Sequence, residues 1–259
     1  MPEAADFNTY WEHVFRYAFA CQQVKKLNVL DIASGEGYGT HALSQVAKSV
    51  IGVDISPEAV EHAQKKYGLV FKTGSAEQIP IESASLDAVV SFETIEHVPN
   101  PKKFVEEAFR VLKPEGLFIV STPNKDVYLK GQAINPFHCS ELTKSEFVSL
   151  LTPCFEIKYI VGQGLPTWLD DFQRIIGIFS NRLGLYFRQR IEQPFKKRFL
   201  PDNIATDIVK RQQIIRSIPT LSTPFNRLWN PYAISRLNDS AKRQPIYFIA
   251  VTTRRRSRV

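Results

Sequence analysis

An apolar strand that runs directly into a glycine-rich turn constrains this chain more than any other feature. Residues 28–33 predict a buried strand, and Gly35, Gly37 and Gly39 follow it at alternate positions. Asp54 closes a second apolar strand 19 residues after Gly35. Glycines let the backbone turn tightly and approach a ligand, and a carboxylate that ends the neighbouring strand can accept hydrogen bonds from two ribose hydroxyls. The pattern therefore predicts a nucleotide-cofactor site.

The glycine spacing and three later segments decide between the cofactors. The spacing is Gly-x-Gly-x-Gly rather than the Gly-x-Gly-x-x-Gly of dinucleotide sites, which disfavours hydride transfer. The later segments are residues 74–80, 85–98 and 111–124. In this order and spacing they resemble the class I S-adenosylmethionine-dependent methyltransferases, across roughly residues 10–162 plus a last strand near 245–253. The resemblance implies S-adenosyl-L-methionine as the cofactor.

Two further segments resemble one branch of this family, which acts on sugars, glycans and lipid-linked precursors. They are residues 16–20, ahead of the first strand, and residues 135–138, which follow residues 123–124. The fourth strand ends in residues 92–95, without the Asn-Pro-Pro-Tyr type of sequence that grips exocyclic amines in nucleic-acid methyltransferases. This favours oxygen over adenine nitrogen as acceptor, so we expect O-methylation of a saccharide or glycan precursor.

The resemblance also implies which residues bind the methionine end of the cofactor. Asp31 and the backbone of Gly35 and Gly37 would face the methionine moiety. Arg16 would pair with the cofactor carboxylate, and the competing interpretation is an exposed arginine on a helix.

By the same resemblance, residues after the second and third strands bind the nucleoside. Asp54 would bind the ribose, in agreement with its position at the end of a strand, and the alternative is a cap for the helix that follows. Ile55 could pack on the adenine, which Ala76 and Glu77 would also contact. Ser75 stands where the family usually has an aspartate near the adenine amino group.

The end of the fourth strand supplies the candidate chemistry. Phe92 and Glu93 would lie beside the cofactor. His97 would face the acceptor hydroxyl, and an imidazole can take a proton near neutral pH. His97 could equally be hydrogen-bonded to the next loop. His138, on the connection after the fifth strand, is the second candidate, either as a base or as a group that binds the acceptor.

Composition limits the remaining classes. Cys21, Cys139 and Cys154 include no short-spaced pair, which argues against a disulfide framework or a zinc site and suits a reducing compartment. No hard-oxygen cluster beyond the cofactor-site carboxylates suggests Mg²⁺, so we expect no metal. No apolar run approaches the roughly 18 residues of a membrane span, and the amino terminus lacks signal-peptide character. We therefore expect a cytoplasmic protein.

Strand and helix patterns alternate along the chain, which predicts an α/β fold: a Rossmann-like, seven-stranded, mostly parallel sheet with helices on both faces. Ser56-Pro57 and Asn100-Pro101 predict helix starts, with a cap followed by proline at the first helical position. The predicted strands are 28–33, 49–54, 69–73, 86–92, 116–122, 155–161 and 246–252, and the predicted helices are 39–47, 57–67, 101–112 and 143–151.

A long insertion separates the last two predicted strands. We expect a methyltransferase core over residues 1–162, a helical basic lid over 163–244 that shapes the acceptor pocket, and the last strand with a basic tail over 245–259. Amphipathic patterns near residues 172–187 and 204–218 favour helices in the insertion.

Charge is distributed unevenly between the two parts of the chain. Residues 172–259 hold 18 Lys and Arg against 4 Asp and Glu, whereas residues 1–171 hold 15 against 22. The basic part could meet phosphate on a lipid carrier, an anionic membrane face or RNA, or it could be a solvated surface. A quinone-type lipid precursor at the membrane face is therefore an alternative acceptor. An RNA-binding or RNA-modifying protein is a further alternative, disfavoured because aromatic and basic residues do not interleave regularly. The oligomeric state stays open.

Overall fold

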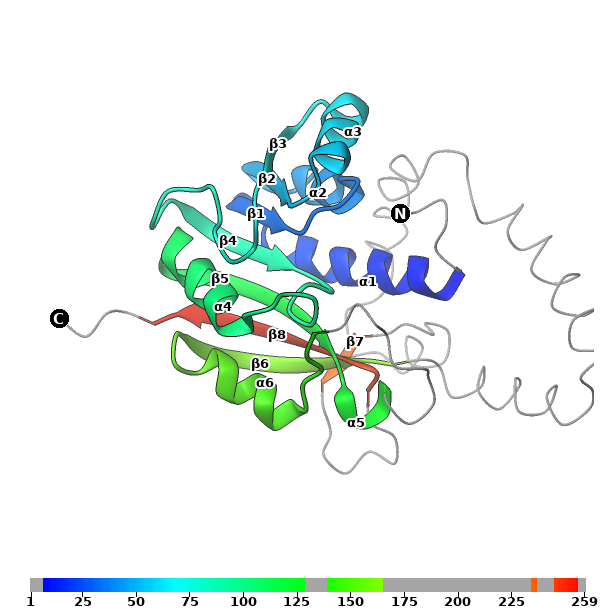
Figure 1. Cartoon of the computed structure of the whole chain (residues 1–259), viewed down its shortest axis with the longest axis vertical. Helices are drawn as coiled ribbons and strands as arrows, with labels where there is room; N and C mark the ends of the chain where they lie inside the picture. Colours follow the sequence, from blue (N-terminus) through cyan, green and yellow to red (C-terminus); the bar gives the residue numbers. More distant parts are fainter. Residues whose placement is uncertain (1–6, 129–138, 165–233, 237–244, 256–259) are drawn as a thin grey trace, which may run out of the picture. The chain divides into compact units, whose positions relative to one another are not determined.

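The computed structural model describes residues 7–128, 139–164, 234–236 and 245–255. Eight strands among these residues form one sheet in the order β3-β2-β1-β4-β5-β8-β6-β7 (Figure 1). The strands are β1 (Asn28–Ile32), β2 (Ser49–Asp54), β3 (Val70–Thr73), β4 (Leu86–Ser91), β5 (Leu112–Pro123), β6 (Phe155–Gln163), β7 (Ile234–Arg236) and β8 (Tyr247–Arg254). The helices are α1 (Phe7–Gln23), α2 (Tyr38–Ser44), α3 (Pro57–Tyr67), α4 (Pro101–Val111), α5 (Lys125–Tyr128) and α6 (Lys144–Leu151).

The sheet has the predicted Rossmann-like, mostly parallel architecture. Strands β3, β2, β1, β4 and β5 run parallel, and β8 runs antiparallel to both β5 and β6. Strand β1 lies between β2 and β4, so the chain turns from one side of β1 to the other after β3. Open α/β sheets bind ligands at the carboxyl ends of the strands beside such a switch. The topology thus predicts a ligand site among the residues that follow β1, β2 and β4.

One short strand departs from the prediction. Strand β7 pairs antiparallel with the end of β6 and falls inside the segment predicted as a helical insertion. Its pairing extends β6 to Gln163, two residues beyond the predicted end. The chain divides into two compact units, residues 1–163 with 234–259 and residues 164–233. Most of the predicted lid lies outside the described residues, so its helical character and its boundaries stay predictions.

The two predicted proline starts are confirmed. Ser56 caps α3 by accepting a hydrogen bond from the Ala59 amide at 3.2 Å, and Asn100 caps α4 by accepting one from the Lys103 amide at 3.1 Å. A capping box begins α6, because Thr143 and Glu146 bind each other's amides. These caps fix where the helices leave the carboxyl edge of the sheet.

Apolar side chains of the strands and of α4 and α6 form the main core. Leu30, Val89 and Phe118 from the sheet are completely buried with Phe104 of α4 and Phe147 of α6. Figure 1 shows α4 and α6 lying over one face of the strands. None of the helices that the structure describes is both long enough and apolar enough to cross a membrane.

Candidate functional site

The glycine turn after β1 adopts the backbone that its composition requires. Gly35 and Gly37 have φ angles of +53° and +82°, in the left-handed region that favours glycine. A Cβ at Gly37 would lie 2.6 Å from the Phe71 ring, and a Cβ at Gly39 would lie 2.0 Å from the Tyr17 ring, so neither position accepts a side chain. A Cβ at Gly35 would meet no atom within 4 Å. The Gly35 backbone therefore faces open space at the carboxyl edge of the sheet.

Asp54 holds this turn from the end of β2. Its Oδ2 accepts a hydrogen bond from the Gly35 amide at 2.7 Å, and its Oδ1 accepts one from the Ser56 amide at 3.0 Å. The cap of α3 is the Ser56 hydroxyl rather than Asp54, which removes the alternative of Asp54 as the helix cap. Ile55, the next residue, is 73% exposed. A fixed carboxylate beside an exposed apolar side chain suits the predicted ribose and adenine contacts.

Helix α1 directs Arg16 and Tyr17 toward the ends of β1 and β4, where they contact Glu93 and Asp31. His13 shares their face of the helix, three and four residues earlier, and its Nδ1 lies 2.9 Å from the Tyr38 hydroxyl. Arg16 is completely buried, and its Nη1 lies 3.3 Å from Oε1 of Glu93. The guanidinium also lies over the ring of Tyr247, 4.5 Å from its centroid. Because the side chain is buried, the alternative of an exposed helix arginine is wrong. None of its three nitrogens makes a hydrogen bond within the described residues.

Asp31 lies in β1 beneath this face of α1. Tyr17 and Thr40 donate hydrogen bonds to its two oxygens, at 3.0 and 2.6 Å. Burial raises the pKa of Asp31 to about 7, although both hydroxyl donors act in the opposite direction. Half of the Asp31 carboxyls would thus be protonated near neutral pH, before any positive charge binds beside them.

The raised pKa of Asp31 predicts a pH-dependent difference between wild type and Asp31→Asn. Between pH 4 and pH 7 the folded wild type keeps a proton that the unfolded chain releases, so its stability falls as pH rises across that window. Asparagine does not titrate there. The free energy of unfolding of the variant, relative to wild type, should therefore rise by roughly 2 to 4 kcal/mol from pH 4 to pH 8. Urea unfolding without ligand checks this. Parallel pH profiles would contradict the assignment.

The segment after β4 holds Glu93 in a strained conformation. Glu93 has a φ of +51°, its amide donates to the Ser121 hydroxyl at 3.1 Å, and that hydroxyl donates back to its Oε1 at 3.0 Å. Such strain persists only where surrounding contacts fix it, which is common at functional sites. The ring of Phe92 is buried and lies edge-on to Tyr17, with centroids 5.1 Å apart. Phe92 therefore supports the site from the core.

The structure describes one of the two predicted bases. His97 is exposed just beyond β4. His138 lies outside the described residues. Cys139, which follows it, donates its amide to the carbonyl of Glu96 at 2.7 Å, and its thiol lies 3.5 Å from the carbonyl of His97. The segment after β5 is thereby fastened to the segment after β4.

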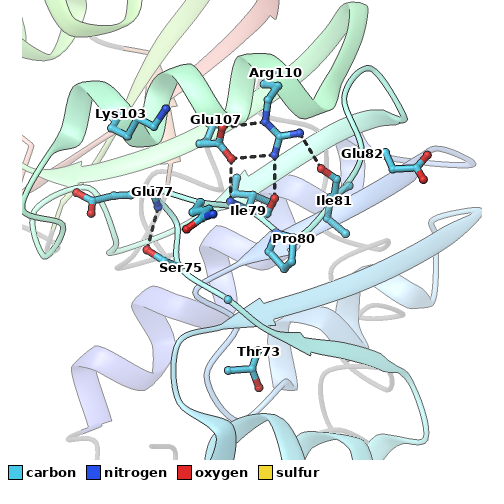
Figure 2. Close-up of a pocket in the computed structure, with 12 residues that line it drawn as sticks. Thr73, Ser75, Glu77, Ile79, Pro80, Ile81, Glu82, Lys103, Glu107 and Arg110 are labelled. Atoms are coloured by element: carbon cyan, nitrogen blue, oxygen red, sulfur yellow. Dashed lines mark hydrogen bonds and ion pairs between the residues drawn. The ribbon is translucent and has the colours of Figure 1, made fainter.

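The loop after β3 carries the predicted adenine contacts. The Ser75 hydroxyl accepts a hydrogen bond from the Glu77 amide at 3.1 Å, and the Glu77 carboxylate accepts one from the amide of Asn100. Figure 2 shows this loop fastened to α4, where Glu107 accepts from the Ile79 amide at 2.8 Å. A cleft of about 850 Å³ lies there, lined by Thr73, Gly74, Ser75, Glu77, Gln78, Ile79, Pro80, Ile81, Glu82, Lys103, Glu107 and Arg110. It reaches the predicted adenine edge rather than the methionine end.

Arg110 completes this fastening of the loop. Its guanidinium donates to both oxygens of Glu107 and to the carbonyls of Ile79 and Ile81, each at 2.8 Å. Both side chains of the pair are engaged with the backbone of the loop as well as with each other. We therefore regard the cleft as the outer side of the loop after β3, where the adenine contacts are predicted.

Comparison with known proteins agrees with this geometry. Residues 30–120 match the sequence profile of a methyltransferase domain. Over these residues the chain is therefore similar to a methyltransferase domain. The chain is 38% identical over 168 residues to a probable S-adenosylmethionine-dependent methyltransferase from Mycolicibacterium smegmatis, covering 62% of this chain and 65% of that one. It is 30% identical over 113 residues to a ubiquinone biosynthesis O-methyltransferase from Bartonella tribocorum, covering 42% and 46% of the two chains.

A solved structure has a fold similar to that of this chain. A protein from Thermotoga maritima, described as a possible histamine N-methyltransferase, superposes with a TM-score of 0.59 at 15% identity, covering 96% of this chain and 92% of that one. This likeness concerns the fold alone. The chain spans between 55% and 65% of the length of the first curated relatives that it matches.

S-adenosyl-L-methionine is the cofactor that this domain implies, and the residues present fit it. The unbonded nitrogens of buried Arg16 suit a carboxylate, and the open space at Gly35 suits close approach of a ligand to the backbone. Among the described residues, no group of three or more His, Cys, Asp and Glu is arranged to hold a metal ion. Sequence reasoning missed Tyr17 and Thr40, which bind Asp31. Their positions beside Arg16 and Gly39 are the only signal that could have indicated them.

Proposed function

We propose that the chain is an S-adenosylmethionine-dependent O-methyltransferase. The observation that carries this proposal is the arrangement around Arg16, a buried guanidinium that is ion-paired with Glu93 and whose three nitrogens make no hydrogen bond to any described residue. Its partner Glu93 follows β4, so it lies at the same carboxyl edge of the sheet as Asp54 and the open backbone of Gly35. Such an edge suits one ligand that carries a carboxylate at one end and a nucleoside at the other.

Methyl transfer from a sulfonium is a displacement, so alignment of the reacting atoms matters more than any single base. Good alignment contributes about 7 to 11 kcal/mol to lowering the barrier, whereas a general base typically adds about 10² to 10⁴-fold in rate. In this proposal Arg16, Asp31 and Asp54 position the donor. His97 and His138 are the candidate bases that contact the acceptor hydroxyl, and the contact of Cys139 with the carbonyls of Glu96 and His97 supports their belonging to one site.

The acceptor that we propose first is a saccharide or glycan precursor attached to a polyprenyl phosphate. It is supported by the positive charge of residues 172–259, which contain 18 Lys and Arg and only 4 Asp and Glu. A basic segment of this kind suits phosphate groups and peripheral contact with an anionic membrane surface. The predicted lid over residues 163–244 would then shape the acceptor pocket.

A quinone-type lipid precursor is the second candidate acceptor. It is favoured by the likeness to the ubiquinone biosynthesis O-methyltransferase of Bartonella tribocorum. Methylation would then take place at the membrane face, where each basic residue near an anionic surface contributes about 1 kcal/mol. The two acceptors differ in polarity, which makes them separable by direct assay.

The test has two stages. Calorimetric titration of wild type with S-adenosylhomocysteine should give micromolar binding. Transfer of labelled methyl groups from S-adenosylmethionine is then measured on polyprenyl-phosphate sugars, on polyprenyl dihydroxybenzoates and on RNA. We expect the sugars to be methylated. Transfer to the benzoates alone would select the second acceptor, and transfer to RNA with a steep salt dependence would overturn both. No binding of the nucleoside to folded protein would contradict the proposed function itself.

A further inference from the structure

Glu96 is a buried carboxyl group that the proposed chemistry has not yet used. Its side chain is completely buried just beyond β4, and neither of its oxygens makes a hydrogen bond within the described residues. Buried polar groups are normally hydrogen-bonded, and a buried charge without a partner is strongly disfavoured. A carboxyl group in this position therefore does not stabilise the fold, which points to a functional role for Glu96.

The backbone of Glu96 fixes where this side chain lies. The Glu96 carbonyl accepts hydrogen bonds from the amides of Cys139 and Ser140, at 2.7 and 3.2 Å, so the segments after β4 and β5 meet at this residue. His97, the next residue, is exposed, whereas Glu96 points into the protein. Glu96 is thus held on the inner side of the segment after β4, next to the predicted base His97.

Three charged groups act electrostatically on Glu96. Burial raises its pKa well above the usual range, and Glu93 raises it further, while Arg16 acts in the opposite direction and Glu141 adds to the rise. Glu93 and Arg16 are the same pair that marks the methionine end of the proposed donor site. With one guanidinium among three carboxyl groups, the least costly state of the cluster keeps a proton on Glu96.

The charge of the ligand should move that proton. S-adenosylmethionine and S-adenosylhomocysteine share the same ammonium and carboxylate groups, and only the former carries a sulfonium charge. An opposite charge within a few ångströms increases the acidity of a carboxyl group by roughly 10- to 1,000-fold. Glu96 should therefore be more ionised in the complex with the donor than in the complex with the product.

We infer that Glu96 is the final acceptor, within the site, of the proton that the acceptor hydroxyl loses, an inference that rests on the proposed O-methyltransferase function. The acceptor oxygen loses its proton and forms a bond to the methyl carbon. The bond between that carbon and sulfur breaks, and its electron pair stays on sulfur. Because the positive charge disappears at the same time, the Glu96 carboxylate becomes a carboxylic acid. His97 can relay the proton from the exposed side.

The test counts protons rather than turnovers. Titration calorimetry of wild type in buffers of different ionisation enthalpy, with EDTA present, gives the protons released on binding S-adenosylmethionine and S-adenosylhomocysteine. We expect the donor to release more, by a substantial fraction of one proton. Glu96→Gln, which keeps the shape of the side chain, should bind both nucleosides and lose this difference. Glu96→Asp should restore part of it, and Glu106→Gln, an exposed carboxyl group on α4, should leave it unchanged.

Several results would overturn the inference. Equal proton release with both nucleosides in wild type would do so, as would a difference that persists in Glu96→Gln and so belongs to Asp31. A difference that appears only with added Mg²⁺ would make these carboxylates metal ligands instead. If Glu96→Gln does not fold, Asp31→Asn decides, because the difference must persist in a variant whose residue 31 cannot titrate. Failure of folded wild type to bind either nucleoside would instead contradict the proposed function.

Discussion

Asp54→Ala should weaken binding of S-adenosylhomocysteine by roughly 100- to 10,000-fold, because hydrogen bonds to a charged group contribute about 1.5 to 3 kcal/mol each and a ribose offers two. The loss has a second physical component. Asp54 also holds the Gly35 amide at 2.7 Å and the Ser56 amide at 3.0 Å, so its removal loosens the turn that the ligand must approach. Titration calorimetry measures the affinity.

Asp87→Ala is the matched control for this loss of structure. Asp87 accepts hydrogen bonds from the Asn28 amide at 2.9 Å and from Lys113 at 2.7 Å, but it does so near the amino ends of β4 and β1. Asp87→Ala should therefore reduce the midpoint of thermal unfolding as Asp54→Ala does. Its affinity for S-adenosylhomocysteine should change no more than about twofold, since distant sites act independently. Equal losses of affinity in the two variants would show that Asp54 acts through stability alone.

Gly35→Ala should weaken cofactor binding by up to roughly 100-fold, because overlap of an added methyl group with a ligand in a packed site costs up to about 3 kcal/mol. A Cβ at Gly35 meets no protein atom within 4 Å, so the fold itself leaves room for it. The variant should remain folded with a modest loss of stability from its φ of +53°. Calorimetry and thermal unfolding on the same sample separate the two effects.

Gly68→Ala supplies the comparison that isolates the ligand. Gly68 ends α3 with a φ of +64°, and a Cβ there also meets nothing within 4 Å. Both substitutions thus carry the same backbone strain in open space, on the order of 1 kcal/mol. Only Gly35 lies in the glycine turn held by Asp54. If Gly68→Ala lost as much affinity as Gly35→Ala, backbone strain rather than ligand contact would explain the result.

Local signals predicted most of the fold, and pairing between distant segments explains what they missed. The starts of α3 and α4 follow from Ser56-Pro57 and Asn100-Pro101, because a cap and a proline act within a single turn. Strand β5 begins at Leu112, four residues before the predicted 116, since Leu112 pairs with Leu86 across an irregular register that no local pattern reveals. Strand β7 was missed for the same reason.

The residues of the candidate site also differ in whether their positions could be predicted from local sequence signals. Asp54 and Ile55 could be placed from sequence because a residue that ends a parallel strand must lie at the ligand edge of the sheet. Glu96 could not, because its complete burial depends on segments that arrive from elsewhere in the chain, including residues 139 and 140. Its position between apolar Ile95 and Val98 was the available hint. The roles of His97 and His138 stay predictions.

The position of β8 between β5 and β6 has a consequence for how the protein is made. The Thr252 hydroxyl donates to the Phe118 carbonyl across 134 residues of sequence, so β5 must wait for its antiparallel neighbour during synthesis. Until then its edge presents unpaired amides and carbonyls, which other chains can pair with. Contacts between such distant residues form slowly. We expect newly made chains to depend on a chaperone until β8 leaves the ribosome, although the strands from β1 to β4 can associate earlier.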